Sequence, residues 1–239
     1  MKKETLVYEG KAKRLYQTNQ RHVLWVEYKD SATAFNAAKK ATIDGKGRYN
    51  NEISSLLFQK LHENEVPNHF VTQISATEQL VAETTIIPIE VVVRNIVAGS
   101  LSKRIGKEEG TILPKAIIEF YYKDDELDDP LINEDHIDVL QLATPRQLEE
   151  IKQLAYKIND ILIASFDQCE VKLVDFKLEF GLNHLGKLIL ADEISPDTCR
   201  LWDKATEQKL DKDVFRRDIG SLTDAYEEIL TRLKGVHHV

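Results

Sequence analysis

The sequence predicts an α+β fold with a smaller N-terminal part and a larger C-terminal part. Short runs of β-branched and aromatic residues crowd residues 1–84, with a single helical pattern among them. Strongly apolar strands and two further helical patterns follow in residues 85–239. The 239 residues are enough for one large domain or two small ones. We place the boundary near residues 81–88, which gives an N-terminal domain of residues 1–84 and a C-terminal domain of residues 85–239.

In the N-terminal part we expect strands around one helix. A turn containing glycine, residues 9–13, separates the first two strands. A flexible polar loop over residues 44–47 precedes a helix from about Asn51, in which Ile53 and Leu61 belong to the apolar face. The predicted strands are residues 5–8, 14–17, 23–28, 71–74 and 79–83.

The C-terminal part is predicted to begin with a central strand and to end with a helix. Its first elements are a strand at 89–96, a short helix at 101–105, a strand at 117–122 and an acidic loop at 124–129. Thr144 is the expected N-cap of a long helix, with Pro145 in its first turn and Gln147 completing a capping box. The last helix is expected over residues 221–234, with Gly235 as its stop.

Composition narrows the class of protein. The chain is 42% hydrophobic and 30% charged, which is typical of globular domains. A net charge of −8 disfavours nucleic-acid partners, although a few lysines and arginines can still form a local anion site. Cys169 and Cys199 lie far apart, which suits a reducing cytosol and argues against a zinc site built on cysteines. No apolar segment follows the first lysines or is long enough to cross a bilayer, so we expect a soluble cytoplasmic protein without a membrane partner.

A charged strand face is the most informative feature of the sequence. In residues 171–179, side chains alternate across a strand, so Asp175, Lys177 and Glu179 share one face. After a turn, the chain returns through residues 187–193, which places Asp192 opposite or diagonal to Lys177 and Glu179 in the expected hairpin. Side chains in opposite or diagonal positions lie about 5–8 Å apart. Two carboxylates at that distance can hold one Mg²⁺, whose remaining ligands are waters and substrate phosphates.

An exposed strand with cross-strand salt bridges would show the same alternation. The segment that follows favours a functional site, because residues 195–203 place a proline, an arginine and a tryptophan directly after two strand acids. That is an unusual end for a plain edge hairpin.

Phosphate-binding candidates lie outside the common nucleotide motifs, because the chain has neither a Walker A sequence nor G-x-G-x-x-G. The turn Gly10-Lys11-Ala12-Lys13 offers close backbone approach and two positive charges, although a basic surface turn would look the same. Arg94 follows three valines in a buried strand and therefore needs a fixed anionic partner. That partner is either Glu90 or another acid, or a substrate phosphate, and the nearby Gly99 and Ser100 favour the phosphate.

These segments together resemble the SAICAR synthetase family over essentially the whole chain, at the length of the bacterial single-function form. The strand around Lys177 and the loop around Arg200 are its specific parts, whereas the Gly-Lys turn is not. The matching segments are residues 8–13, 88–94, 98–100, 129–130, 173–181, 192–193, 195–197, 200–203, 212–213 and 215–216.

The resemblance implies a fold related to ATP-grasp and protein-kinase-like proteins, with a nucleotide-binding N-terminal part. It implies a ligase of purine biosynthesis that joins carboxyaminoimidazole ribonucleotide (CAIR) to L-aspartate, converts ATP to ADP and phosphate, and passes through an acyl phosphate. Mg²⁺ is the implied cofactor, and a homodimer is the implied assembly.

The resemblance also assigns roles to residues of this chain. Glu179 and Asp192 would hold the metal, and Lys177 and Asp175 would be catalytic. The residues implied to bind ATP are Gly10, Lys11, Ala12, Lys13, Val81, Ala82 and Glu83. Those implied to bind substrate are Arg94, Ser100, Lys123, Asp129, Arg200 and Arg216.

Two positions depart from the family pattern. Asn36 stands where an acid is expected, and Cys199 replaces a more usual serine before Arg200. Two other functions remain open from the residues themselves: a kinase-like phosphotransferase with the same hairpin, and a nucleotide-sensing module without catalysis.

Overall fold

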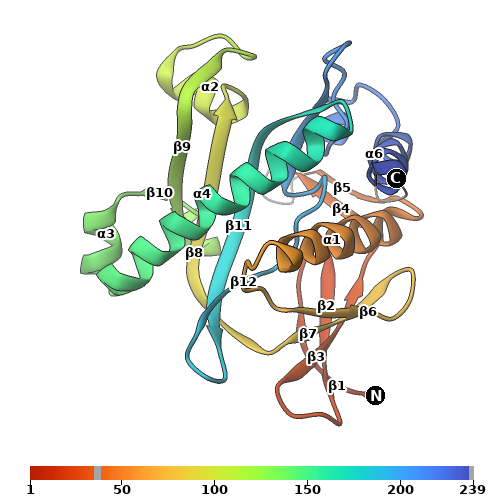
Figure 1. Cartoon of the computed structure of the whole chain (residues 1–239), viewed down its shortest axis with the longest axis vertical. Coiled ribbons are helices and arrows are strands. Elements are labelled where there is room, and N and C mark those ends of the chain that lie inside the picture. The colour runs from red at the N-terminus through yellow and green to blue at the C-terminus, as the bar shows by residue number, and fades with distance from the viewer. Residues whose placement is uncertain (35–38, 237–239) are drawn as a thin grey trace.

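The strands of the computed structural model, which describes residues 1–34 and 39–236, separate into two main antiparallel sheets (Figure 1). The first sheet has the order β1 (Lys3–Glu9), β2 (Lys13–Thr18), β3 (Val23–Tyr28), β7 (Glu78–Ala82) and β6 (Phe70–Gln73). The second has the order β10 (Leu131–Ile132), β9 (Ile112–Tyr122), β8 (Thr84–Ile96), β11 (Val171–Asn183) and β12 (Leu188–Ala191), and β13 (Cys199–Asp203) also pairs with β11. A separate hairpin joins β4 (Ser31–Ala34) to β5 (Lys39–Thr42).

The helices cover these sheets and fill the space between them. The longest is α4 (Pro145–Gln168), which crosses the second sheet and packs on β11 (Figure 1). Helix α1 (Lys46–Glu63) belongs to the first half of the chain. It packs against α6 (Leu222–Val236), the last helix of the chain. The shorter helices are α2 (Gly99–Ile105), the 3₁₀ turn η1 (Asp125–Leu127), α3 (Glu134–Val139) and α5 (Asp213–Arg217). Within the described ranges, no helix is both long and apolar enough to span a membrane.

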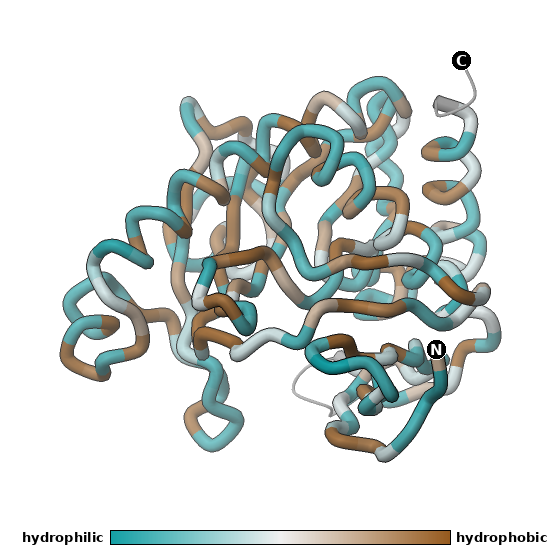
Figure 2. Tube along the Cα trace, turned by 60° about the horizontal axis from the view of Figure 1, so that its bottom comes forward, coloured by the Kyte–Doolittle hydropathy of each residue, from teal (hydrophilic) through white to brown (hydrophobic). Residues whose placement is uncertain are grey.

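The capping box predicted for α4 is confirmed. The Thr144 hydroxyl accepts the Gln147 N–H at 3.2 Å, and the Gln147 side-chain oxygen accepts the Thr144 N–H at 2.8 Å. Behind this start, Leu148, Ile151 and Ile158 are buried on one face. Hydrophobic and hydrophilic residues alternate along the helices in Figure 2, as expected for helices with one buried side.

One large core connects the two halves of the chain. It joins Ile53 and Phe58 of α1 to Val91 of β8, Phe176 of β11 and Tyr226 of α6. The chain passes from the first sheet to the second at Glu83, within the boundary expected from the sequence. Because α1 packs into the same core as the second sheet, a division at residue 84 remains a prediction.

The predicted loop over residues 44–47 is confirmed for Asp44 and Gly45, which form a turn, and is wrong for Lys46 and Gly47, because α1 begins at Lys46 rather than near Asn51. Gly45 precedes the helix with a φ of 80°, a backbone conformation that favours glycine. A Cβ on Gly47 would lie 2.8 Å from the carbonyl oxygen of Tyr28, so only glycine lets the helix start this close to β3. Two glycines that suggested flexibility therefore fix a buried helix start.

Most other elements lie where they were expected, with differences of a few residues at their ends. Helix α6 continues through Gly235 to Val236, two residues beyond the predicted end at Lys234, so the predicted stop is wrong. No element was predicted at the positions of β4, β5, β10, β13, α3 and α5, which are two to six residues long. Segments this short carry too little periodicity to be recognised.

Candidate active site

Strand β11 carries its charged residues at the centre of the second sheet. Asp175, Lys177 and Glu179 lie on one face, opposite Arg94, Val92 and Glu90 of β8. Asp175 is 4% exposed and Glu179 is 6% exposed, so this face is largely covered. The alternative of an exposed edge strand is therefore excluded. Because buried charges must be paired, each of these side chains needs an opposite charge nearby.

The partners of Lys177 are carboxylates. Its Nζ lies 2.9 Å from Oε1 of Glu90, 3.1 Å from Oε1 of Glu179 and 4.0 Å from Oδ2 of Asp192. Lys123 contacts the same Oε1 of Glu179 at 2.5 Å. Burial alone would lower the pKa of Lys177, but these carboxylates hold it well above its ordinary value. Lys177 is thus a fixed positive charge between the two predicted metal ligands.

Asp192 reaches this cluster by a different route from the one expected. Ala191, not Asp192, pairs with Glu179, so continued strand alternation would turn Asp192 to the apolar face. Strand β12 ends at Ala191, and Asp192 has a φ of 62°, which takes it out of the strand. The predicted cross-strand register is wrong, while the predicted proximity of Asp192 to Lys177 is confirmed.

The turn Gly10-Lys11-Ala12-Lys13 of the first sheet faces the carboxylates of the second. The Gly10 N–H donates to the Lys13 carbonyl at 2.8 Å, which closes the turn. Lys13 forms an ion pair with Asp192 and lies 4.0 Å from Glu193. Burial alone would raise the pKa of Asp192, but Lys13 and Lys177 hold it well below its ordinary value. Lys11 is exposed and contacts Asp125 at 3.4 Å.

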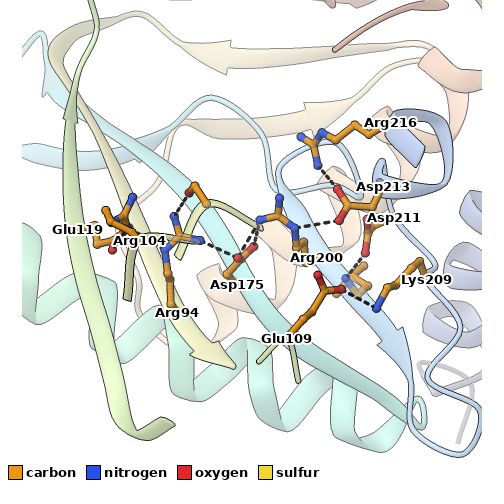
Figure 3. Close-up of polar contacts among 12 residues, drawn as sticks. Arg94, Arg104, Glu109, Glu119, Asp175, Arg200, Lys209, Asp211, Asp213 and Arg216 are labelled. Carbon is orange, nitrogen blue, oxygen red and sulfur yellow. Dashed lines mark hydrogen bonds and ion pairs between the residues drawn. The ribbon is translucent and has the colours of Figure 1, made fainter. Parts of the chain in front are cut away.

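Arg94 lies at a second charged centre, shown in Figure 3. Its guanidinium donates to Glu119 at 2.7 Å, to Asp175 at 2.8 Å and to the Ser100 hydroxyl at 3.3 Å. The protein itself therefore supplies fixed acids to Arg94, although Glu90 is not one of those that hydrogen-bond to it.

Asp175 and Asp213 hold Arg200 between them (Figure 3). Nη1 of Arg200 lies 2.9 Å from Oδ2 of Asp175, and Nε lies 3.1 Å from Oδ2 of Asp213. Asp213 also accepts from Arg216 at 2.7 Å. Gly99 lies against this arginine, since a Cβ there would be 2.5 Å from Nη2 of Arg200. The predicted neighbourhood of Arg94, Gly99, Ser100 and Arg200 is confirmed.

Both charged centres open on one cavity of about 340 Å³. A second cavity, of about 430 Å³, lies against α3 and α4 and contains none of the predicted site residues. The charged residues that line the first are Lys11, Glu90, Arg94, Asp175, Lys177, Glu193, Asp197, Arg200, Lys212 and Arg216.

The donor set suits magnesium shared with a phosphate ligand. Glu179 and Asp192 supply two carboxylates beside one lysine. Among the described residues, no group of three His, Cys, Asp or Glu side chains could enclose a metal. Magnesium commonly takes one or two carboxylates and completes its shell with water and substrate phosphates, so the residues present fit that ion.

More than half of the predicted site residues lie outside the cavity lining, the two predicted metal ligands among them: Gly10, Lys13, Val81, Ala82, Glu83, Ser100, Lys123, Asp129, Glu179 and Asp192. Val81 and Ala82 end β7, and Glu83 follows it. The Ala82 N–H donates to the backbone carbonyl of His69, and the Glu83 N–H donates to the backbone carbonyl of His22. The Asp129 carboxylate accepts the Asp124 N–H at 3.0 Å. Asn36 lies outside the described residues.

Cys199 does line the cavity, but it is buried, and burial raises the pKa of its thiol. The thiol is therefore held in its neutral form.

Other charged residues of the site were assigned no functional role from the sequence, where Glu90 was considered only as a partner of Arg94. Glu90 and Glu119 each interrupt an apolar strand, which is a usable signal for a buried ion pair. Asp213 and Asp197 stood within segments that matched the family, without a pattern that indicated their partners. Glu193 is 5% exposed, and its Oε2 has no hydrogen-bond partner in the described structure. Burial raises its pKa.

The comparisons with known proteins cover nearly the whole chain. A sequence model described as SAICAR synthetase matches residues 6–233. The phosphoribosylaminoimidazole-succinocarboxamide synthase of Anoxybacillus flavithermus is 65% identical over 236 residues, covering 99% of this chain and 98% of that protein. The crystal structure of the synthase from Ehrlichia chaffeensis matches with a TM-score of 0.94 at 48% identity, over 96% of this chain and 98% of that one. A SAICAR synthetase solved in complex with ADP matches with a TM-score of 0.93 at 47% identity, over 95% and 97%.

Proposed function

The chain belongs to the SAICAR synthetase family, ATP-dependent ligases of purine biosynthesis, and we propose that it joins the carboxylate of CAIR to the amino group of L-aspartate. One observation carries the proposal. A phosphate-and-metal centre around Lys177 and an arginine centre around Arg94 open on the same cavity. A ligase of this kind must hold two anionic substrates next to the nucleotide phosphates, and these two centres meet that need.

ATP would lie on the side of the first sheet. A relative with 47% identity was solved with ADP, which supports a nucleotide site in this chain. Lys11 and Lys13 would contact the phosphates, with Gly10 and Ala12 allowing close backbone approach. Adenine would lie at Val81, Ala82 and Glu83. Since the N–H groups of Ala82 and Glu83 already donate within the protein, adenine must use the carbonyl groups or displace these bonds.

Glu179 and Asp192 would hold Mg²⁺ against the ATP phosphates. Three lysines, Lys13, Lys123 and Lys177, form ion pairs with these two carboxylates. When bound, the ion supplies positive charge that stabilises phosphoryl transfer. The lysines are then free to turn toward the phosphate oxygens.

The reaction begins with a poor electrophile, because a carboxylate does not react with an amine until one of its oxygens becomes a leaving group. We assign to Lys177 the stabilisation of charge on the transferring phosphoryl group as a CAIR carboxylate oxygen attacks it and ADP leaves. The aspartate amine then attacks the acyl phosphate, loses a proton and expels phosphate with that oxygen. Asp175 orients the arginines that hold CAIR in line.

CAIR would bind through its phosphate to Arg94, Ser100 and Arg200. Both arginines keep a protein acid on one side, Glu119 for Arg94 and Asp213 for Arg200, which fixes their direction. Lys123, Asp129 and Arg216 would complete the substrate site. We also propose a cytoplasmic homodimer, an N-terminal nucleotide-binding domain of residues 1–84, and a relation to ATP-grasp and kinase-like folds.

The proposal is tested by ADP release with ATP, Mg²⁺, CAIR and L-aspartate, omitting each component in turn. Release that requires all four, together with a succinocarboxamide product, is expected. Release that ignores aspartate would indicate a phosphotransferase or an ATPase. Nucleotide binding without release, which survives loss of Glu179, would indicate a sensing module.

A further inference from the structure

A buried lysine at the start of α1, Lys46, forms an ion pair with Asp197, which lines the substrate cavity. Lys46 is 0% exposed, and its Nζ lies 2.6 Å from Oδ2 of Asp197. The Nζ contacts no other acid in the ranges that the structure describes. A buried ammonium is costly unless it is paired, so Lys46 depends on this one carboxylate.

Asp197 is shared between two lysines. Its Oδ2 lies 2.6 Å from Nζ of Lys46 and 3.4 Å from Nζ of Lys212. Its Oδ1 accepts a hydrogen bond from the Tyr226 hydroxyl at 2.5 Å, which fixes the carboxylate from α6. Burial alone would raise the pKa of Asp197, but the two lysines hold it well below its ordinary value, so it carries a full negative charge.

Lys212 forms a weaker ion pair with Asp197 than Lys46 does, because the same carboxylate oxygen lies farther from it. Its side chain is 13% exposed and lines the cavity, and Asp197 is its only ion-pair partner among the described residues. Burial lowers the pKa of Lys212, and the positive charges of Lys46 and Arg216 lower it further. One carboxylate therefore faces two ammonium groups, and the nearer one cannot reach water.

We propose that Lys46 is a positioning residue: it takes up the charge of Asp197 and thereby leaves Lys212 free to bind a substrate carboxylate. This rests on the proposed function, in which two substrates bring carboxylates into the cavity. The group that binds the Lys212 ammonium is a carboxylate, and its source is either CAIR or L-aspartate. Without Lys46, Asp197 would pair with Lys212 alone and compete with the ligand.

Charge counting over Lys46, Asp197 and Lys212 gives the test. The wild type has one surplus positive charge, Lys46→Met has none, and Lys46→Met with Asp197→Asn has one again. The KM values for CAIR, L-aspartate and ATP are measured for each, with the Kd values of CAIR and L-aspartate in the presence of ADP from calorimetry. Lys60→Met, on a partly exposed position of the same helix, is the matched control.

Lys46→Met should raise KM and Kd for one carboxylate substrate roughly 10-fold or more, while KM for ATP stays unchanged. Asp197→Asn in the same chain should restore the value, which loss of packing alone would not do. If Lys46→Met does not fold, Lys212→Met must show the same loss, and the double variant Lys46→Met with Asp197→Asn must match the wild type. An unchanged carboxylate KM in Lys46→Met, or a double variant no better than the single one, overturns the inference. A wild type that binds these ligands without ligating them overturns only the proposed reaction.

Discussion

Replacing Gly99 with alanine should separate substrate binding from stability. Gly99 has a φ of 55°, and an alanine Cβ there would lie 2.5 Å from Nη2 of Arg200. The guanidinium must move, and its contacts with Asp175 at 2.9 Å and Asp213 at 3.1 Å must change with it.

The magnitude follows from the two effects of the new methyl group. An alanine in the left-handed region costs about 1–2 kcal/mol, partly offset by roughly 0.4–1 kcal/mol from the less flexible unfolded chain. A lost charge-assisted hydrogen bond from Arg200 to the CAIR phosphate costs about 1.5–3 kcal/mol, or roughly 10- to 150-fold in KM. KM for ATP should not change.

Gly106→Ala supplies the matched control. Gly106 ends the same helix, α2, with a φ of 63°, and a Cβ there would meet nothing within 4 Å. Gly106→Ala should lose about 1 kcal/mol of stability in urea unfolding and Gly99→Ala at least as much, but only Gly99→Ala should raise KM for CAIR. An equal rise in both variants, or none in Gly99→Ala, would refute the role given to Arg200.

Three further results are expected. Glu179→Gln should keep the fold, by circular dichroism, and lower turnover by about 100-fold or more, because the amide keeps the shape but weakens metal binding; normal turnover would remove Glu179 from the metal site. Burial, with Asp213 nearby, raises the pKa of Asp211 to about 7, so its proton is bound more tightly in the folded protein, and its contribution to stability falls as pH rises from about 4 to 7. In urea unfolding, the stability of the wild type relative to Asp211→Asn should therefore fall by about 2.5 kcal/mol between pH 5 and pH 7.5; a relative stability independent of pH contradicts this. Since burial raises the pKa values of Cys169 and Cys199, iodoacetamide at pH 8 should modify neither thiol in the native protein and both in denaturant; rapid native labelling would show that a thiol is accessible.

The sequence predicted those parts of the fold whose signal is local. The capping box at Thr144 and the apolar stripe behind it are complete within one helix. The alternation from Asp175 to Glu179 likewise placed three charged side chains on one strand face.

The start of α1 was missed because Gly47 is explained by its close approach to Tyr28, which belongs to a different element of the chain. The position of Asp192 was missed in detail because a single residue with positive φ changes the face of a side chain. Residues without a local pattern were the hardest to assign. Asp213 forms ion pairs with Arg200 and Arg216, and Asp197 forms ion pairs with Lys46 and Lys212. The spacing of these residues in the sequence did not indicate that they pair. Such networks depend on tertiary contacts between α1, the loop after β12 and α5.

The central claim, that ATP activates a carboxylate for attack by an amine, is tested most directly by an isotope. CAIR labelled with ¹⁸O in its carboxylate is incubated with ATP, Mg²⁺, L-aspartate and the enzyme, and the released phosphate is analysed by mass spectrometry. We predict one labelled oxygen in the phosphate for each molecule of product formed. Unlabelled phosphate, or product formed without phosphate release, would contradict the account.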